Sequence, residues 1–130
     1  MKIGFTGTQV GMSEVQKLRL GVELYNLGPE EFHHGDCIGA DEEAVKIARE
    51  LGIKIVMHPP TNESKRAWTY QTGDQVWAAA PYLDRNKEIV RATDRLIAAP
   101  KTNKEEIRSG TWSTVRYAWA MGKNVLLLRR

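Results

Sequence analysis

Four consecutive residues late in the chain favour the binding of an anion. They are Arg108, Ser109, Gly110 and Thr111, and they form a small polar loop that opens a predicted helix. The first turn of a helix has backbone N–H groups without partners and carries the positive end of the helix dipole. The arginine adds a full positive charge. The loop is therefore predicted to bind a phosphate group, with Trp112 in the first helical turn close enough to reach the same site.

A second candidate loop follows the first apolar segment of the chain. Its residues Thr6, Gly7, Thr8 and Gln9 resemble a dinucleotide-binding loop only loosely, because the third glycine of that pattern is missing. The small residues would let a ligand approach closely, and either threonine hydroxyl could donate to a phosphate or a ribose. The alternative is a tight turn between a strand and a helix that contacts no ligand.

A third loop combines two glycines with two carboxylates. Gly35 and Gly39 lie on either side of a turn, with Asp36 at the end of a strand and Asp41 near the start of the next helix. Asp36 is predicted to accept hydrogen bonds from ribose hydroxyls or to act as a general base. Asp41 has two interpretations, either a general base or a cap of the helix. Cys37 between them is predicted to fill space in the core.

Arginine at a predicted helix start is a further indication of a ligand. The helix dipole disfavours a guanidinium there, so Arg85 and the adjacent Asn86 are predicted to bind a phosphate or carboxylate. The alternative is an ion pair of Arg85 with Asp84 or Asp94. His58, at the end of a strand, is predicted to line the same site.

The histidines and the cysteine do not indicate a metal site. His33 and His34 are neighbours on a predicted strand and must point to opposite faces of the sheet. The chain has one cysteine and no pair of histidines at metal-binding spacing. We expect no metal and no cofactor.

The elements that must position these loops alternate between strand and helix. The first predicted helix is capped by Ser13 and has Val15, Leu18, Val22 and Tyr25 at helical spacing. Residues 61–84 show no period and contain four aromatic side chains, which indicates a lid or an interaction surface, or a short helix over residues 74–80. The predicted strands cover residues 2–6, 31–35, 54–58, 95–99 and 124–128, and the predicted helices end near residues 27, 51, 93 and 122.

This alternation predicts an α/β fold. Strands that are mostly unbroken apolar runs, each followed by a helix, are typical of a doubly wound, Rossmann-like, mostly parallel sheet with helices on both faces. We expect five strands in one domain that covers residues 1–130. In such a sheet the ligand binds outside the carboxyl ends of the strands, where all the candidate loops lie.

Composition limits the classes of function. The 130 residues carry a formal charge of +3, which permits an anionic ligand. This charge is too small to favour a dedicated nucleic-acid-binding protein. No apolar run approaches the roughly 20 residues of a membrane span. A single cysteine fits a reducing compartment. We expect a cytoplasmic protein without a membrane partner.

The order of these motifs resembles the SLOG superfamily, which groups DNA-processing DprA domains, LOG phosphoribohydrolases and small YspA-like nucleotide-binding proteins. The resemblance rests on Gly35, on the Gly-Ala-Asp that ends at Asp41, on Arg85, and on the Ser-Gly-Thr that ends at Thr111. It implies that Ser109, Gly110 and Thr111 contact phosphate, and that Arg85 stands where LOG enzymes have an arginine. Their catalytic glutamate would fall at Thr114, and a neutral hydroxyl cannot take its place.

Three functions follow from the residues and the resemblance. The first is the binding of a nucleotide or a nucleotide-derived phosphorylated small molecule. The second is hydrolysis of the N-glycosidic bond of a nucleoside monophosphate, with Asp36, Asp41 or Asp84 in place of the missing glutamate. The third is a DprA-like module that binds single-stranded DNA. We also expect a homodimer or a higher homo-oligomer.

Overall fold

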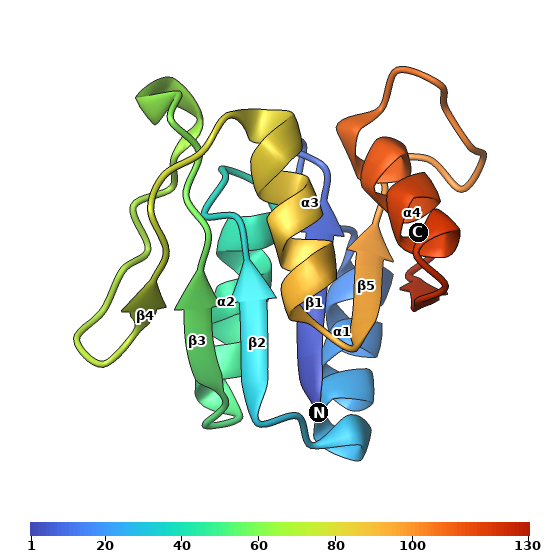
Figure 1. Ribbon diagram of the computed structural model, residues 1–130. Coiled ribbons are helices and arrows are strands. Elements are labelled where there is room, and N and C mark those ends of the chain that lie inside the picture. Colours follow the sequence, from blue (N-terminus) through green and yellow to red (C-terminus); the bar gives the residue numbers. More distant parts are fainter.

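Six parallel strands form the centre of the structure, which is a computed structural model describing all of residues 1–130 (Figure 1). Their spatial order is β4-β3-β2-β1-β5-β6. This is a doubly wound sheet, as predicted. The strands are β1 (Lys2–Gly7), β2 (Glu31–His34), β3 (Lys54–Met57), β4 (Gln75–Val76), β5 (Arg95–Ala99) and β6 (Asn124–Leu127).

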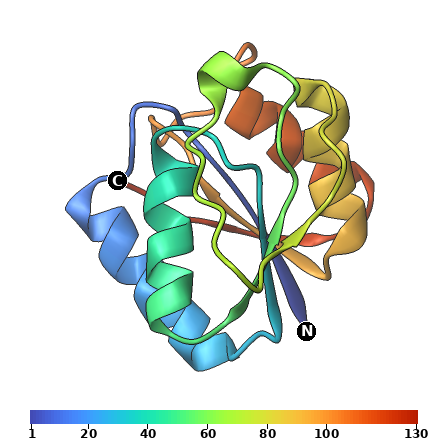
Figure 2. The same cartoon turned by 90° about the vertical axis from the view of Figure 1, so that its left-hand side faces the viewer.

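Four helices cover the sheet, two on each face. Figure 1 shows α3 and α4 in front of the strands and α1 and α2 behind them, and Figure 2 shows the same layers from the side. Every crossover between parallel strands passes through a helix or a long loop. The helices are α1 (Glu14–Leu27), α2 (Ala40–Glu50), α3 (Tyr82–Ala92) and α4 (Gly110–Ala120), and one short 3-10 helix covers Glu63–Lys65.

The strand count differs from the predicted fold. The structure has six strands rather than five, because β4 pairs Gln75 and Val76 with β3 inside the segment predicted to lack a pattern. Two residues are too few to show an alternating pattern in the sequence. Residues 74–80 form no helix. Trp77, which follows β4, lies against His58, with 4.4 Å between the ring centroids.

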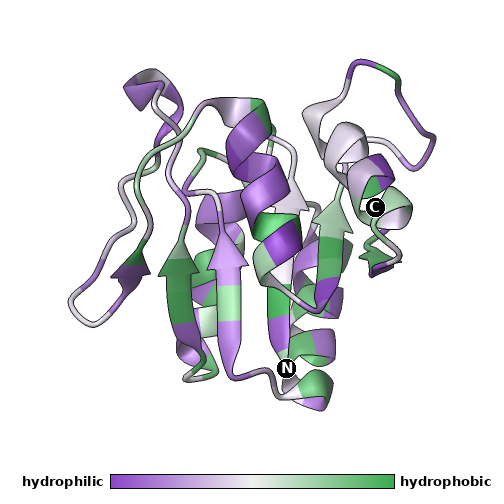
Figure 3. Ribbon diagram, viewed as in Figure 1, coloured by the Kyte–Doolittle hydropathy of each residue, from purple (hydrophilic) through white to green (hydrophobic).

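The apolar core is divided by the sheet into two clusters. One lies between the sheet and α1 and α2, and the other lies under α3 and α4. Strands β3 and β5 are largely hydrophobic in Figure 3, whereas β2 is largely hydrophilic because it carries His33 and His34. These two histidines point to opposite faces, as predicted: His33 contacts His58, and His34 stacks on Phe32.

Helix α1 forms where it is predicted, and its regularly spaced apolar residues are not the ones that it buries. Its start is capped by Ser13 and Gln16 in a reciprocal pair of hydrogen bonds. The Gln16 side chain is buried and donates to the carbonyls of Pro100 and Leu128. Gln16 therefore ties α1 to the chain beyond β5 and β6, and the buried side of the helix is the one that carries Leu20 and Leu24. The opposite side of the helix is exposed and carries the regularly spaced residues Val15, Leu18, Val22 and Tyr25.

The order of the strands reverses between β1 and β5. These two strands are neighbours with five residue pairs in register, yet the chain leaves β1 toward β2 and leaves β5 toward β6. The connections after β1 and β5 therefore diverge, which opens a space at the carboxyl edge of the sheet. None of the four helices combines the length and apolar character that spanning a membrane requires.

Candidate ligand-binding cleft

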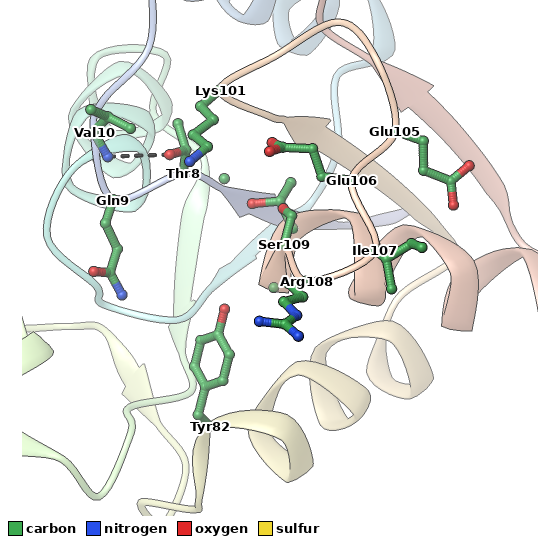
Figure 4. A pocket seen from close by; sticks show the side chains of 13 residues that line it. Thr8, Gln9, Val10, Tyr82, Lys101, Glu105, Glu106, Ile107, Arg108 and Ser109 are labelled. Carbon is green, nitrogen blue, oxygen red and sulfur yellow. Dashed lines mark hydrogen bonds between the residues drawn. The ribbon is translucent and has the colours of Figure 1, made fainter.

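A cleft of about 650 Å³ opens at this reversal point (Figure 4). Three parts of the chain line it: residues 7–10 after β1, Tyr82 at the start of α3, and Lys101 with residues 105–111 from the loop after β5 into α4. A second hollow of about 430 Å³ shares Tyr82, Arg108 and Ser109 with it and extends to Asn62 and Lys65. The predicted phosphate loop and the first candidate loop thus face one space.

The first turn of α4 presents free hydrogen-bond donors at the cleft. Ser109 caps the helix: its hydroxyl accepts from the N–H of Trp112, and its carbonyl accepts from the N–H of Ser113. The N–H groups of Gly110 and Thr111 have no acceptor within the chain. Both residues line the cleft, at the positive end of the helix dipole. This is the geometry of an anion site.

Tyr82 closes the cleft on the side of α3. Its hydroxyl packs against the α-carbon of Gly110, so closely that a side chain at position 110 would overlap it. Burial raises the pKa of Tyr82 above its ordinary value, so the phenol keeps its proton near neutral pH. Glycine at position 110 is therefore required for the contact with Tyr82. It also leaves the N–H groups of the α4 turn accessible.

The cleft has an excess of free positive charge. Lys101 and Arg108 line it, are exposed, and form neither an ion pair nor a hydrogen bond within the chain. Figure 4 shows Arg108 beside Tyr82, and Glu105 directed away from the centre. Of the two carboxylates of the lining, Glu105 pairs with Arg116 at 2.8 Å, whereas Glu106 accepts only from the Thr102 hydroxyl and keeps its negative charge. The two free cations therefore exceed the one free carboxylate.

The loop after β1 is held in one conformation. The Thr8 hydroxyl accepts from the N–H of Val10 at 3.2 Å, and the Thr8 carbonyl accepts from Gly11 and Ala40. Gln9 beyond it is exposed and lines both hollows. Thr6 is buried within β1 and does not line the cleft. The amide oxygen of Gln9 accepts from Lys65 at 3.4 Å, and the loop offers the amide N–H groups of Gln9 to a ligand from a fixed backbone.

Arg85 lies beneath the cleft rather than in it. It is buried, and its guanidinium donates to the carbonyls of Gly35 and His58, to the Cys37 sulfur and to the amide oxygen of Asn86. Each nitrogen of the guanidinium therefore donates to an acceptor within the chain itself. Neither of the predicted ion pairs, with Asp84 or with Asp94, forms. Arg85 joins α3 to the ends of β2 and β3.

The two carboxylates of the third loop are also engaged by the chain. Asp36 is fully buried at a positive φ of 53°, pairs with Arg66 at 2.9 Å, and accepts from the hydroxyl and N–H of Thr69. Asp41 accepts from the N–H groups of Gly35 and Cys37. Burial raises the pKa of Asp41 to about 6, against the lowering effect of nearby Arg85. Both carboxylates stabilise the turn after β2.

His58 belongs to a buried chain of polar groups on the α3 side of the sheet. Its Nε2 lies 2.8 Å from Nδ1 of His33, whose other nitrogen contacts Glu31. Its Nδ1 is 3.7 Å from Glu88 and has no hydrogen-bond partner. Burial lowers the pKa of His58 to about 3. His58 is neutral at pH 7 and does not line the cleft.

The structure thus divides the predicted site residues into two sets. Trp112 is buried in the core under α4, and its indole N–H has no acceptor. Asp84 is exposed on the first turn of α3, outside the cleft. The residues that line the cleft or its adjoining hollow are Gly7, Thr8, Gln9, Arg108, Ser109, Gly110 and Thr111. Those that do not line it are Thr6, Gly35, Asp36, Gly39, Asp41, His58, Asp84, Arg85, Asn86 and Trp112.

Six residues of the cleft lining were not predicted as site residues from the sequence: Val10, Tyr82, Lys101, Glu105, Glu106 and Ile107. Lys101 and Ile107 belong to the loop that precedes Ser109, and the position of that loop, directly after a strand end, was the available signal. Tyr82 was identified only as one of four aromatic residues in a segment without a pattern. Its role depends on α3 starting three residues before the predicted start, which brings the ring to Gly110.

Comparisons with known proteins identify solved structures of similar fold. No protein-family model matches the sequence, and no curated protein is similar to it in sequence. Among solved structures, the structural-genomics target TM1055 is 25% identical, over 95% of this chain and 71% of that one, with a TM-score of 0.69. The molybdenum cofactor binding protein of Rippkaea orientalis is 22% identical, and the match covers 97% of this chain and 74% of that one, with a TM-score of 0.72.

DNA processing protein A of Helicobacter pylori has the same fold. It is 19% identical to this chain, with a TM-score of 0.65, and the match covers 98% of this chain and 64% of that one. The chain therefore spans slightly less than two thirds of that protein. Together these similarities confirm the doubly wound fold, and one of them is to a DprA protein, a group that the resemblance in the sequence names.

Proposed function

We propose that the protein binds a nucleotide or a nucleotide-derived phosphorylated small molecule in the cleft, with the phosphate on the first turn of α4. One observation carries this proposal: the unpartnered N–H groups of Gly110 and Thr111 face a cleft whose Lys101 and Arg108 have no partner either. Backbone donors, a helix dipole and two free cations all favour the same kind of group, a dianionic phosphate.

The rest of the cleft suits the remainder of such a ligand. Gln9 offers a side-chain amide, and Tyr82 offers one exposed aromatic side chain at the boundary between the two hollows. Aromatic faces stack on nucleobases of any kind, and an amide forms hydrogen bonds with base or ribose. A relative of similar fold is described as a molybdenum cofactor binding protein, which supports a small-molecule ligand for this cleft.

We favour binding without turnover over the hydrolase alternative. Of the carboxylates predicted to replace the missing glutamate, Asp36 and Asp41 are buried and hydrogen-bonded, and Asp84 lies outside the cleft. Thr114 donates its hydroxyl proton to the carbonyl of Gly110 and stays on the helix. None of these groups is placed to activate water against a ligand held at Gly110.

Isothermal titration calorimetry with nucleoside mono- and diphosphates tests the proposal. Arg108→Ala and Lys101→Ala each remove a charge-assisted contact, so each is expected to weaken binding roughly tenfold or more. Lys46→Ala is the matched control, because Lys46 is an exposed cation on α2 outside the cleft, and it should leave the affinity unchanged. The absence of heat from every phosphorylated ligand, or equal affinity in all three variants, would refute the proposal.

A further inference from the structure

Helix α1 is apolar on two opposite sides. The side that faces the sheet buries Leu20 and Leu24 completely. On the opposite side, the side chains of four large apolar residues are exposed to solvent. They are Val15 (54% exposed), Leu18 (70%), Val22 (50%) and Tyr25 (76%).

The spacing of the exposed residues matches a helix–helix seam. Steps of three, four and three residues from Val15 to Tyr25 are those of the a and d positions of a heptad repeat. At 100° per residue the four side chains form one stripe on the outer side of the helix. A stripe of this kind is stabilised by packing into the gaps of a facing helix. A helix with apolar residues on both sides is normally covered on both sides.

No other part of the chain covers this stripe. Figure 2 shows α1 at the outer edge of the helical layer, with α2 as its only helical neighbour. The side toward α2 is marked by the ion pair of Lys17 with Glu43 and by Gly21 against Ile47. Val15, Leu18, Val22 and Tyr25 lie beyond these contacts and face away from the molecule.

We propose that this stripe binds a second copy of the chain, with the two α1 helices antiparallel about a two-fold axis level with Leu20. The positions are self-complementary about that level: Val15 meets Tyr25 of the second copy, and Leu18 meets Val22. A surface that matches its own two-fold image forms a closed dimer and leaves no free binding face. The proposal concerns α1 only and does not depend on a ligand in the cleft.

The charges beside the stripe fit the same arrangement. Arg19 and Glu23 lie on one side of it, and neither forms an ion pair within the chain. The two-fold axis brings Arg19 and Glu23 of both copies together on the same side of the seam, with the two Arg19 side chains nearest to each other and a Glu23 beyond each of them. On the opposite side Lys17 is already neutralised by Glu14 and Glu43. The two helices therefore meet with two cations and two anions on one side and with neutralised lysines on the other, so neither side has an excess of one sign.

A hollow beside the stripe accommodates the largest of the four side chains. It measures about 470 Å³ and lies between α1 and α2, with Leu18 and Ile47 as its apolar lining. In the antiparallel arrangement, the ring of Tyr25 from the second copy reaches the level of Val15 on the α2 side of the seam, which is the level of this hollow. Tyrosine fits such a place because its ring is apolar and its hydroxyl can remain in contact with water.

Sedimentation velocity over a range of protein concentrations tests the interface. We expect a dimer for the unmodified chain and a dissociation constant at least about 100-fold higher for Leu18→Glu or Val22→Glu, because each puts two unpaired carboxylates into the seam. Met121→Glu is the matched control, since Met121 is an exposed apolar residue on the opposite layer, and it should leave the dimer intact. Circular dichroism and the unfolding midpoint verify that each variant is folded.

Exchange of the two charges identifies the antiparallel arrangement. Arg19→Glu alone and Glu23→Arg alone should each weaken the dimer, whereas the double variant should restore it, because the pair is rebuilt with its signs reversed. A monomeric unmodified chain, or a dimer that survives Leu18→Glu and Val22→Glu, would overturn the proposal. Loss of the dimer in Met121→Glu would also overturn it, by placing the interface on α4. None of these outcomes depends on ligand binding, so they test the interface separately from the cleft.

Discussion

Arg85 shows how a residue type that suits a ligand can serve the chain instead. An arginine near a helix start was predicted to bind phosphate or carboxylate, and the structure surrounds its guanidinium with the acceptors of Gly35, His58 and Asn86. The sequence identified the residue as unusual but not the direction of its side chain. That direction depends on β2 and β3 ending beside α3, which is a property of the tertiary structure.

Replacement of Arg85 is expected to act on stability. Arg85→Ala leaves the buried carbonyl oxygens of Gly35 and His58 without donors, and Arg85→Lys supplies too few donors in the wrong geometry. Each variant should lower the free energy of unfolding by about 3 kcal/mol, measured by urea denaturation. Arg91→Ala on the exposed side of the same helix is the control, and its effect should stay within about 0.5 kcal/mol. A fully stable Arg85→Ala would contradict the structural role.

At the scale of elements, the predicted alternation of strand and helix is confirmed, and β5 has the predicted bounds. The errors have identifiable causes. Strand β4 is two residues long, and its pairing with β3 is not visible as a pattern in the sequence. The apolar spacing in α1 was correct for a helix but lies on the exposed side, because Gln16 fixes which side faces the sheet. Periodicity alone cannot choose between two apolar sides of one helix.

Three histidines are buried, two in β2 and one directly after β3, so the stability of the fold should depend on pH. Burial lowers the pKa of His58 to about 3 and that of His34 to about 4. Burial also lowers the pKa of His33, although the hydrogen bond of His33 with Glu31 acts in the opposite direction. The unfolded chain takes up these protons below pH 6.5, whereas the folded protein does not. Stability is therefore complete above pH 6.5 and is lost as the pH falls toward 3.

Asp41 acts in the opposite direction over part of this range. Its pKa of about 6 means that the folded protein takes up this proton at a higher pH than the unfolded chain does. Protonation of Asp41 therefore adds stability to the folded protein as the pH falls from 6 toward 4. The three histidines outweigh one carboxylate. Urea denaturation should show a net loss on the order of 3 kcal/mol from pH 7 to pH 4. Asp41→Asn, which removes the opposing effect, should make that loss larger. A stability that is constant over this range would contradict the burial of the histidines.

At the scale of the whole molecule, the doubly wound sheet brings separate loops to one edge. The residues after β1 and those before α4 are about 100 positions apart in the sequence, yet Thr8 and Ser109 line the same cleft. This convergence could be predicted from the alternation of elements, because the carboxyl ends of parallel strands share one edge. The contact of Tyr82 with Gly110 could not, because it depends on how α3 and α4 pack together.

The phosphate site on α4 is the central claim, and the amide signals of Gly110 and Thr111 report on it most directly. In a ¹⁵N–¹H NMR titration with a nucleoside monophosphate, these two amides are expected to shift the most and to move downfield, because they gain an anionic acceptor. The matching nucleoside without phosphate should leave them nearly unchanged. If the two amides do not move while others do, or move equally with the nucleoside, the ligand binds elsewhere or is not held by its phosphate.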